Sequence, residues 1–297
     1  MVAKSKISLN RLARGGKAWY NSGSTKERSV VMVTKYPIVL THGIVLKDVK
    51  FFKAFGHIET LLRDNGYSVH TSQTDGFGSI ENNAAQLKAQ IEEIMQAEGV
   101  DKVNIIAHSK GGLDSRYMID HLGMSAHVAS LTFLCTPHKG SKLATRLYAL
   151  PRVFKYPLAC YLHVAYRMFG DKQPEVLKVC EQLRYAPEGA LETLDLTVPD
   201  ATYEHIFMQS YSATMNKSTD DFVMGIPLIF SRYFEKGAPS DGMVSVESSQ
   251  YANYRGDCID GSVSHSEIVD FMVNKKKKDK IYAFYLSLCE DLANRGY

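Results

Sequence analysis

The sequence alternates short apolar runs with segments whose apolar residues recur at helical spacing. The apolar runs, which are rich in β-branched side chains, cover residues 36–43, 67–71, 102–108 and 128–136. Runs of this length and composition predict buried strands, and the segments between them predict helices. Because strand and helix alternate, we expect an α/β fold with a mostly parallel sheet, right-handed crossovers and helices on both faces.

This alternation is interrupted between residues 143 and 218, where the sequence is mostly apolar and aromatic with helical character. The interruption follows the fourth strand and so lies next to the carboxyl ends of the strands, where ligands of such sheets bind. We expect a mostly helical cap or lid over an apolar acyl pocket, with ordinary core as the alternative. The predicted organisation is a basic arm at residues 1–35, a core at 36–142 and 219–297, and the cap at 143–218.

The alternation resumes with an apolar run at residues 227–231, which predicts a fifth strand. The last helix is predicted from apolar residues that recur on one face, among them Ile281 and Leu288. Just ahead of that helix lies the lysine run 275–278. A run of like charges is expected to be solvated.

Ser109 lies at the junction between the third strand and the helix that follows it. Small residues flank it at two positions before and two after, namely Ala107 and Gly111. A sharp strand-to-helix elbow requires small residues there, and it exposes the serine hydroxyl above the sheet beside the N–H groups of the helix. The pattern favours a nucleophile, and an ordinary turn with a capping serine is the alternative.

A serine hydroxyl needs a base to take its proton, and that base needs a carboxylate to orient it. In the elbow architecture the chain order is serine, acid, histidine. His265 is the only histidine after the predicted fifth strand, and Asp241 lies 24 residues before it in a Ser-Asp-Gly turn. We therefore predict Ser109 as nucleophile, Asp241 as acid and His265 as base.

Other residues compete for these roles. Glu247 and Asp114 are rivals for the acid, although Asp114 lies on the wrong side of the elbow. Cys135 is a weak candidate nucleophile, because it ends a strand without an elbow. The remaining histidines inside motifs are expected to support the site or the fold: His42, His108 and His138.

Stabilising the oxyanion requires two backbone N–H donors. One comes from the residue after the nucleophile, Lys110, and the other from the loop after the first parallel strand, at Ile44. In a known enzyme, loss of one such donor costs roughly 3 to 4 kcal/mol in the transition state.

Composition limits the remaining possibilities. The chain has 297 residues, 45% of them hydrophobic, and a net charge of +3, which does not favour a general nucleic-acid binder. No apolar run reaches the roughly 18 residues that span a membrane, and residues 1–35 have no apolar core of a signal peptide. The five cysteines include no C-x-x-C pair, which suits a reducing compartment. We expect a cytoplasmic protein, or one exported without a classical signal peptide.

The chain resembles the bacterial triacylglycerol lipases of the α/β-hydrolase fold. The segments that carry the resemblance are residues 36–44, 102–112, 136–141 and 241–245 and the turn at His265. The resemblance implies the same triad, Ser109, Asp241 and His265, and the same oxyanion donors, Ile44 and Lys110. It also implies a lipid or ester substrate met at a lipid–water interface, and no cofactor for the chemistry. Lys110 is an unusual residue after the nucleophile.

The resemblance raises the question of a structural calcium ion near the catalytic histidine. Relatives hold it through an acid before the triad acid and another just after the histidine, positions that correspond to Asp221 and Glu267 here. Glu267 is longer than the usual Asp, and calcium takes six or more oxygen ligands. A site with calcium and a site without it both stay open. A short-chain esterase, an acyltransferase and a catalytically silent binding protein stay open as alternatives to a lipase.

Overall fold

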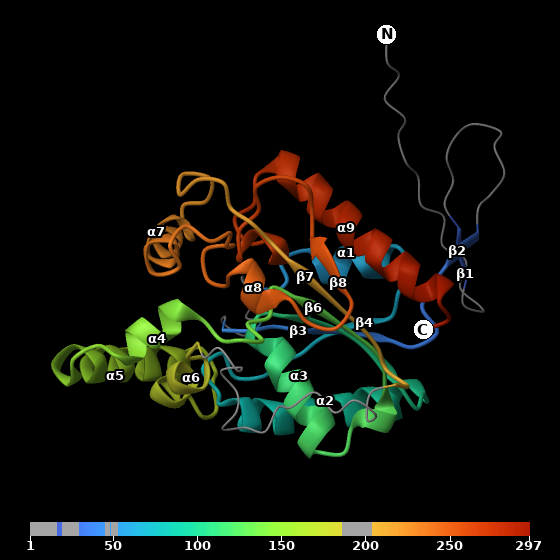
Figure 1. The fold of residues 1–297 in the computed structure, drawn as a ribbon. Helices are drawn as coiled ribbons and strands as arrows, with labels where there is room; N and C mark the ends of the chain where they lie inside the picture. The colour runs from blue at the N-terminus through green and yellow to red at the C-terminus, as the bar shows by residue number, and fades with distance from the viewer. Residues whose placement is uncertain (1–16, 20–29, 45–47, 49–52, 186–203) are drawn as a thin grey trace, which may run out of the picture.

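A parallel six-stranded sheet forms the centre of the computed structural model (Figure 1), which describes residues 17–19, 30–44, 48, 53–185 and 204–297. The strand order is β4-β3-β5-β6-β7-β8, and every neighbouring pair is parallel. The strands are β3 (Ile38–Thr41), β4 (Val69–Thr71), β5 (Val103–His108), β6 (Val128–Leu134), β7 (Phe207–Ser212) and β8 (Tyr254–Asp257). The first four lie within the runs that the sequence pattern predicts.

Helices cover both faces of this sheet (Figure 1). On one face α1 (Ile58–Asp64) and α9 (Lys275–Asn294) pack with β3 and β4 around Tyr285, and on the other α2 (Ile80–Glu98) and α3 (Lys110–His121) pack with β5 and β6. Both clusters consist of side chains that are almost wholly withdrawn from solvent. Burying β-branched and leucine side chains on both faces is what stabilises a parallel sheet, at about 25 cal/mol per Å² of apolar surface.

A group of helices lies at the edge of the sheet where the strands end. It contains α4 (Lys142–Tyr148), α5 (Arg152–Met168), α6 (Val176–Gln182) and, above them in Figure 1, α7 (Gly225–Phe234). The remaining short elements are β1 (Lys17–Trp19), β2 (Val30–Met32), α8 (Val246–Ser249) and the 3-10 turns η1 (Ser125–His127) and η3 (Glu267–Val269). None of the described helices is long and apolar enough to cross a membrane.

The prediction of a fifth strand at residues 227–231 is wrong, because this run lies inside helix α7. A short apolar run fits a strand or a buried helix equally well, and Pro227 lies in the first turn of α7, where a missing N–H is tolerated. The fifth strand is β7, so the cap does not extend to residue 218 as predicted. Three of the residues of β7, Gln209, Ser210 and Ser212, are polar and fully buried, which hid the strand from a search for apolar runs.

Two other predictions need revision. The lysine run 275–278 forms the first turn of α9 rather than a solvated lead-in, and Lys277 and Lys278 are partly buried in ion pairs. Within the predicted arm 1–35, β1 and β2 pair as antiparallel strands. Residues 1–16 and 20–29 of that arm lie outside the described residues, as do residues 186–203 of the predicted cap.

Candidate active site

Ser109 occupies a strained turn between β5 and α3. Its φ is 55° and its ψ −133°, a backbone conformation that residues other than glycine rarely adopt. Neighbouring backbone crowds the turn so closely that a Cβ on Gly111 would lie 2.5 Å from the carbonyl oxygen of His42. The sequence therefore needs glycine at this position, and the strain directs the Ser109 side chain away from the strand.

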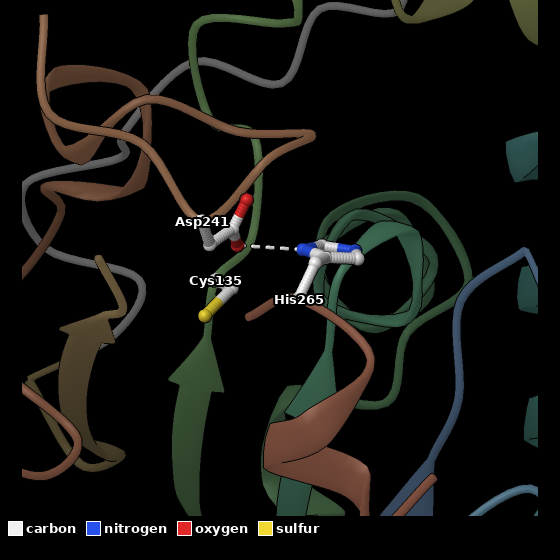
Figure 2. Close-up of side chains that lie close together, drawn as sticks. All are labelled: Cys135, Asp241 and His265. Atoms are coloured by element: carbon white, nitrogen blue, oxygen red, sulfur yellow. Dashed lines mark hydrogen bonds and ion pairs between the residues drawn. The ribbon is translucent and has the colours of Figure 1, made fainter. Parts of the chain in front are cut away.

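The structure brings Ser109, Asp241 and His265 together from three separate segments. The Ser109 hydroxyl lies 2.8 Å from Nε2 of His265. Nδ1 of His265 lies 2.6 Å from Oδ2 of Asp241 (Figure 2). Asp241 and His265 lie in loops after β7 and β8, in the chain order expected for this elbow. These distances allow a proton to pass from the hydroxyl to the imidazole while the carboxylate fixes the ring.

The carboxylate of Asp241 is held by the backbone around it. Oδ1 accepts hydrogen bonds from the N–H groups of Met243 and Val244, at 2.9 and 2.8 Å. The N–H of His265 donates to the carbonyl oxygen of Asp241 at 2.9 Å, which joins the two loops. Oδ2 is thereby presented to the imidazole, and the carboxylate cannot rotate away without losing two hydrogen bonds.

Cys135 lies beside this acid and histidine (Figure 2). Its sulfur, one oxygen of Asp241 and one nitrogen of His265 all lie within 4.8 Å of one another. The adjacent Cys258 thiol, burial and the negative charge of Asp241 raise the pKa of Cys135 well above its ordinary value. The thiol therefore stays protonated, which argues against a nucleophile and against a metal ligand.

The loop that carries the expected oxyanion donor Ile44 passes directly over the elbow. A Cβ on Gly43 would lie 2.6 Å from Cβ of Ser109 and 3.0 Å from the backbone nitrogen of Lys110. Only glycine permits this approach. The loop and the start of α3 therefore converge on the Ser109 hydroxyl, as the two predicted donors require.

The rival residues lie elsewhere. Glu247 is exposed and pairs with Lys139 at 3.2 Å. The ring of His138 stacks on Tyr251 with centroids 4.2 Å apart. His108, by contrast, contacts the site, because its ring centre lies 4.5 Å from that of His265.

Burial and the nearby His265 lower the pKa of His108 well below its ordinary value, so this ring is uncharged at neutral pH. The His108 ring therefore places no positive charge beside His265. In the sequence, the signal that His108 supports the site is its position immediately before Ser109.

Lys110 forms a buried ion pair one helical turn into α3. Its ammonium nitrogen lies 2.8 and 3.0 Å from the two oxygens of Asp114, and both side chains are at most 1% exposed. Burial raises the pKa of Asp114 to about 6, against the lowering influence of the Lys110 charge. The unusual lysine after the nucleophile is thus directed into the protein, while its backbone N–H stays at the elbow.

Two cavities open on the Ser109 hydroxyl. The first has a volume of about 240 Å³ and runs under the cap, where its walls are almost entirely apolar. Its lining includes Phe77, Leu143, Leu147, Leu162, Val176, Val179 and Leu183. The second, of about 310 Å³, lies on the side of His42 and Phe271. Ser109, His265, Ile44 and Met224 line both cavities, so the reacting atoms lie where the two meet.

The residues expected to bind calcium do not fit a metal ion. Asp221 accepts hydrogen bonds from the N–H groups of Val223 and Met224 and from the hydroxyls of Ser264 and Ser266. A carboxylate has about four acceptor positions, so these donors fill them. Glu267 is bound by the Lys277 ammonium at 2.8 Å. An ammonium and four hydrogen-bond donors therefore hold the oxygens that a calcium ion would need.

The chain is similar to known lipases. Triacylglycerol lipase 2 of Saccharomyces cerevisiae is 30% identical over 261 residues, which are 81% of this chain and 73% of that protein. The chain belongs to the triacylglycerol lipase family. The sequence model of the palmitoyl protein thioesterase family also matches residues 37–188, slightly more than half of the chain, so the chain belongs to that family as well.

Bacterial members of the lipase family match a shorter part of the chain. Triacylglycerol lipase of Burkholderia plantarii is 37% identical over 117 residues, which are 37% of this chain and 32% of that protein. Together with the yeast relative, it confirms the family that the motifs indicate.

Solved structures share the fold of this lipase-family chain. Staphylococcus hyicus lipase has a TM-score of 0.63 at 14% identity and covers 88% of this chain and 96% of its own. A metagenomic carboxyl esterase has a TM-score of 0.62 at 16% identity and covers 97% of this chain and 82% of its own. The predicted α/β-hydrolase fold is confirmed.

The ion pair of Lys110 and Asp114 predicts a pH dependence of stability. Folding disfavours ionised Asp114, so its contribution to the free energy of unfolding falls as pH rises from about 4 to about 6. Replacing Lys110 by methionine removes the positive charge that limits how far burial raises the pKa of Asp114. We expect Lys110→Met to lose about 1.4 kcal/mol of stability per pH unit above pH 6, where wild type no longer does.

Urea unfolding at pH 6 and pH 8 measures this difference. The double variant Lys110→Met/Asp114→Asn is the control, because it has no titrating group at the site and its stability should change no more than that of wild type. Parallel pH profiles for wild type and Lys110→Met would show that the pair does not act in this way.

Proposed function

We propose that this chain hydrolyses long-chain carboxylic esters, acylglycerols above all, through an acyl-enzyme on Ser109. The continuous hydrogen-bonded path from Asp241 through His265 to Ser109, open to an apolar cavity, is the observation that supports this most directly. Membership of the triacylglycerol lipase family supports the substrate class.

The geometry suggests the role of each residue. Oγ of Ser109 attacks the ester carbonyl carbon while Nε2 of His265 takes the hydroxyl proton, and Asp241 stabilises the imidazolium. The negative charge on the carbonyl oxygen develops beside the N–H groups of Ile44 and Lys110. His265 then gives its proton to the departing alkoxide, and a water activated by the same ring releases the fatty acid.

The two cavities suggest how the substrate is divided. The apolar cavity under the cap fits the acyl chain, because it offers apolar walls and few polar partners. The cavity beside His42 fits the alcohol, since it meets the first cavity at Ser109 and His265. In this arrangement His265, the proton donor, faces the alkoxide oxygen that leaves the ester.

The surface of the cap and of the neighbouring helix α7 supports action at a lipid–water interface. Apart from Met272, every large apolar side chain exposed in the described part of the chain lies within residues 147–169 or 222–233. The most exposed of these are Phe222, Met168 and Tyr233, at 93, 80 and 79%. Exposed apolar surface gathered in this way marks an interaction site.

Charge on the same helices favours an anionic lipid surface. The charged residues of α4, α5 and α7 are all basic: Lys142, Arg146, Arg152, Lys155, Arg167 and Arg232. Basic residues combined with exposed aromatic ones are typical of segments that lie in the interface of anionic membranes. We therefore include such a surface in the proposed function.

Thioester hydrolysis is a second candidate, favoured by the match to the palmitoyl protein thioesterase family. It needs the same acyl-enzyme with a thiolate as leaving group. Comparing palmitoyl esters with palmitoyl thioesters in one assay separates the two activities.

The nucleophile is tested by Ser109→Ala. With p-nitrophenyl butyrate and palmitate, we expect turnover to fall on the order of a millionfold, because the triad acts as a unit. Hydrolysis by the variant at the wild-type rate would contradict the assignment. Hydrolysis of butyrate alone by wild type would indicate a short-chain esterase.

The acyl cavity is tested by Ala159→Phe. Ala159 lines the cavity from α5 and is 8% exposed, so a phenyl ring there shortens the space available. We expect kcat/KM for palmitate to fall at least tenfold, about the 1 to 3 kcal/mol by which hydrophobic pockets discriminate, and that for butyrate to change little. Val164→Phe, on the exposed side of the same helix, is the control. Equal losses for both substrates would argue against an acyl role for this cavity.

The lipid surface is tested by sedimentation with vesicles, using the Ser109→Ala variant so that no lipid is consumed. We expect stronger binding to phosphatidylcholine vesicles containing phosphatidylglycerol than to phosphatidylcholine alone, and weaker binding at high salt. Adding Phe154→Ser and Tyr161→Ser should reduce binding, and Met272→Ser should not. Binding that ignores both lipid charge and these variants would rule out this orientation.

A further inference from the structure

The loop that carries His265 is held from both sides by Asp221. The hydroxyl groups of Ser264 and Ser266, the residues immediately before and after the histidine, both donate to Oδ2 of Asp221. The Ser266 hydrogen bond is 2.9 Å long. Although burial opposes the shift, these bonds and the backbone N–H groups of Val223 and Met224 hold the pKa of Asp221 below its usual range. The carboxylate is therefore ionised and binds the two hydroxyls strongly.

A second carboxylate holds the same loop. Oε2 of Glu267 accepts the N–H of Ser264 at 3.0 Å. Both oxygens of Glu267 are bound by the Lys277 ammonium, at 2.9 and 2.8 Å, and that nitrogen also lies 3.4 Å from the carbonyl oxygen of Asp220. The Glu267 side chain is 4% exposed, so it needs a positive partner.

The position of Lys277 suggests that this contact is specific. It lies in the first turn of α9, where the helix dipole disfavours a cation. Its backbone N–H is fixed by the side chain of the capping residue Asn274 at 3.1 Å. Its ammonium group turns toward Glu267 and the Asp220 carbonyl, whereas the adjacent Lys276 is exposed.

We propose that the Lys277 ammonium takes the place of the calcium ion implied by the resemblance to bacterial lipases, and that it positions His265. Lys277 neutralises the charge of Glu267. Glu267 and Asp221 both accept hydrogen bonds from Ser264, and Asp221 also accepts one from Ser266. The side chains of Asp221, Glu267 and Lys277 together form a clamp around the loop of the base, which they contact at Ser264 and Ser266. Lys277 is a positioning residue and touches no reacting atom. The proposal rests on the proposed function, because ester hydrolysis is its readout.

The first experiment compares the requirement for metal with the requirement for Lys277. Wild type dialysed against EDTA should keep its kcat on p-nitrophenyl butyrate, and added Ca²⁺ should not raise it. Lys277→Met should lower kcat about tenfold or more with KM nearly unchanged, because a small misplacement of the base affects the transition state rather than binding. Lys277→Arg should recover part of the loss, and Lys276→Met should match wild type.

A second pair of variants disturbs the loop less. Ser266→Ala removes one donor to Asp221, and Ser262→Ala removes a hydroxyl on the same loop that donates to Asp220 instead. We expect kcat to fall for Ser266→Ala alone, with KM unchanged. This pair decides the matter if Lys277→Met does not fold.

Three results would overturn the clamp. The first is activity that EDTA abolishes and Ca²⁺ restores in wild type, the second is an unchanged kcat for a folded Lys277→Met variant, and the third is an unchanged kcat for Ser266→Ala. Failure of the proposed function is a separate result, seen when wild type hydrolyses no ester or when Ser109→Ala remains active.

Discussion

Close backbone packing at the end of β5 is the constraint on which the site depends. The turn at Ser109 has a φ of 55°, and it persists because neighbouring segments leave it no other conformation. Gly43 and Gly111 lack the side chains that would otherwise collide with Ser109 and with the carbonyl of His42. The same packing brings Gly43, the residue before the expected donor Ile44, close to both Ser109 and the backbone nitrogen of Lys110. The proposed nucleophile and the predicted oxyanion site therefore depend on the same backbone packing.

Much of the core could be predicted from the sequence, because its strands are short β-branched runs buried on both faces. The acid and the base could be predicted because parallel strands end at one edge, which leaves chain order to identify His265 and Asp241. Strand β7 could not, since its buried Gln209, Ser210 and Ser212 are polar. Each is satisfied by a partner distant in sequence, as Gln209 is by Thr132 at 3.1 Å. The spacing of apolar residues along the chain does not reveal such hydrogen-bonded pairs.

The contacts of Lys277 show a different limit of sequence reasoning. A run of four lysines indicates a solvated face, and that holds for Lys275 and Lys276, which are exposed. Lys277 differs because helix α9 begins at residue 275 and turns its side chain toward Glu267, and Lys278 likewise pairs with Asp270. The start of the helix is set by the capping side chain of Asn274, a local detail that composition and charge do not reveal. The acids that suggested a calcium ion therefore have partners within the chain.

The meeting of two cavities at Ser109 has a kinetic consequence. In the proposed mechanism the alcohol leaves first from the cavity beside His42, while the acyl chain stays under the cap. The same space then admits the second reactant, so the reaction is of the ping-pong type. Water and a second alcohol would compete there for one acyl-enzyme. The ratio of hydrolysis to transesterification then depends on how well that cavity excludes water. Ile44 and Met224 line both cavities, so they lie beside the reacting atoms in acylation and in deacylation.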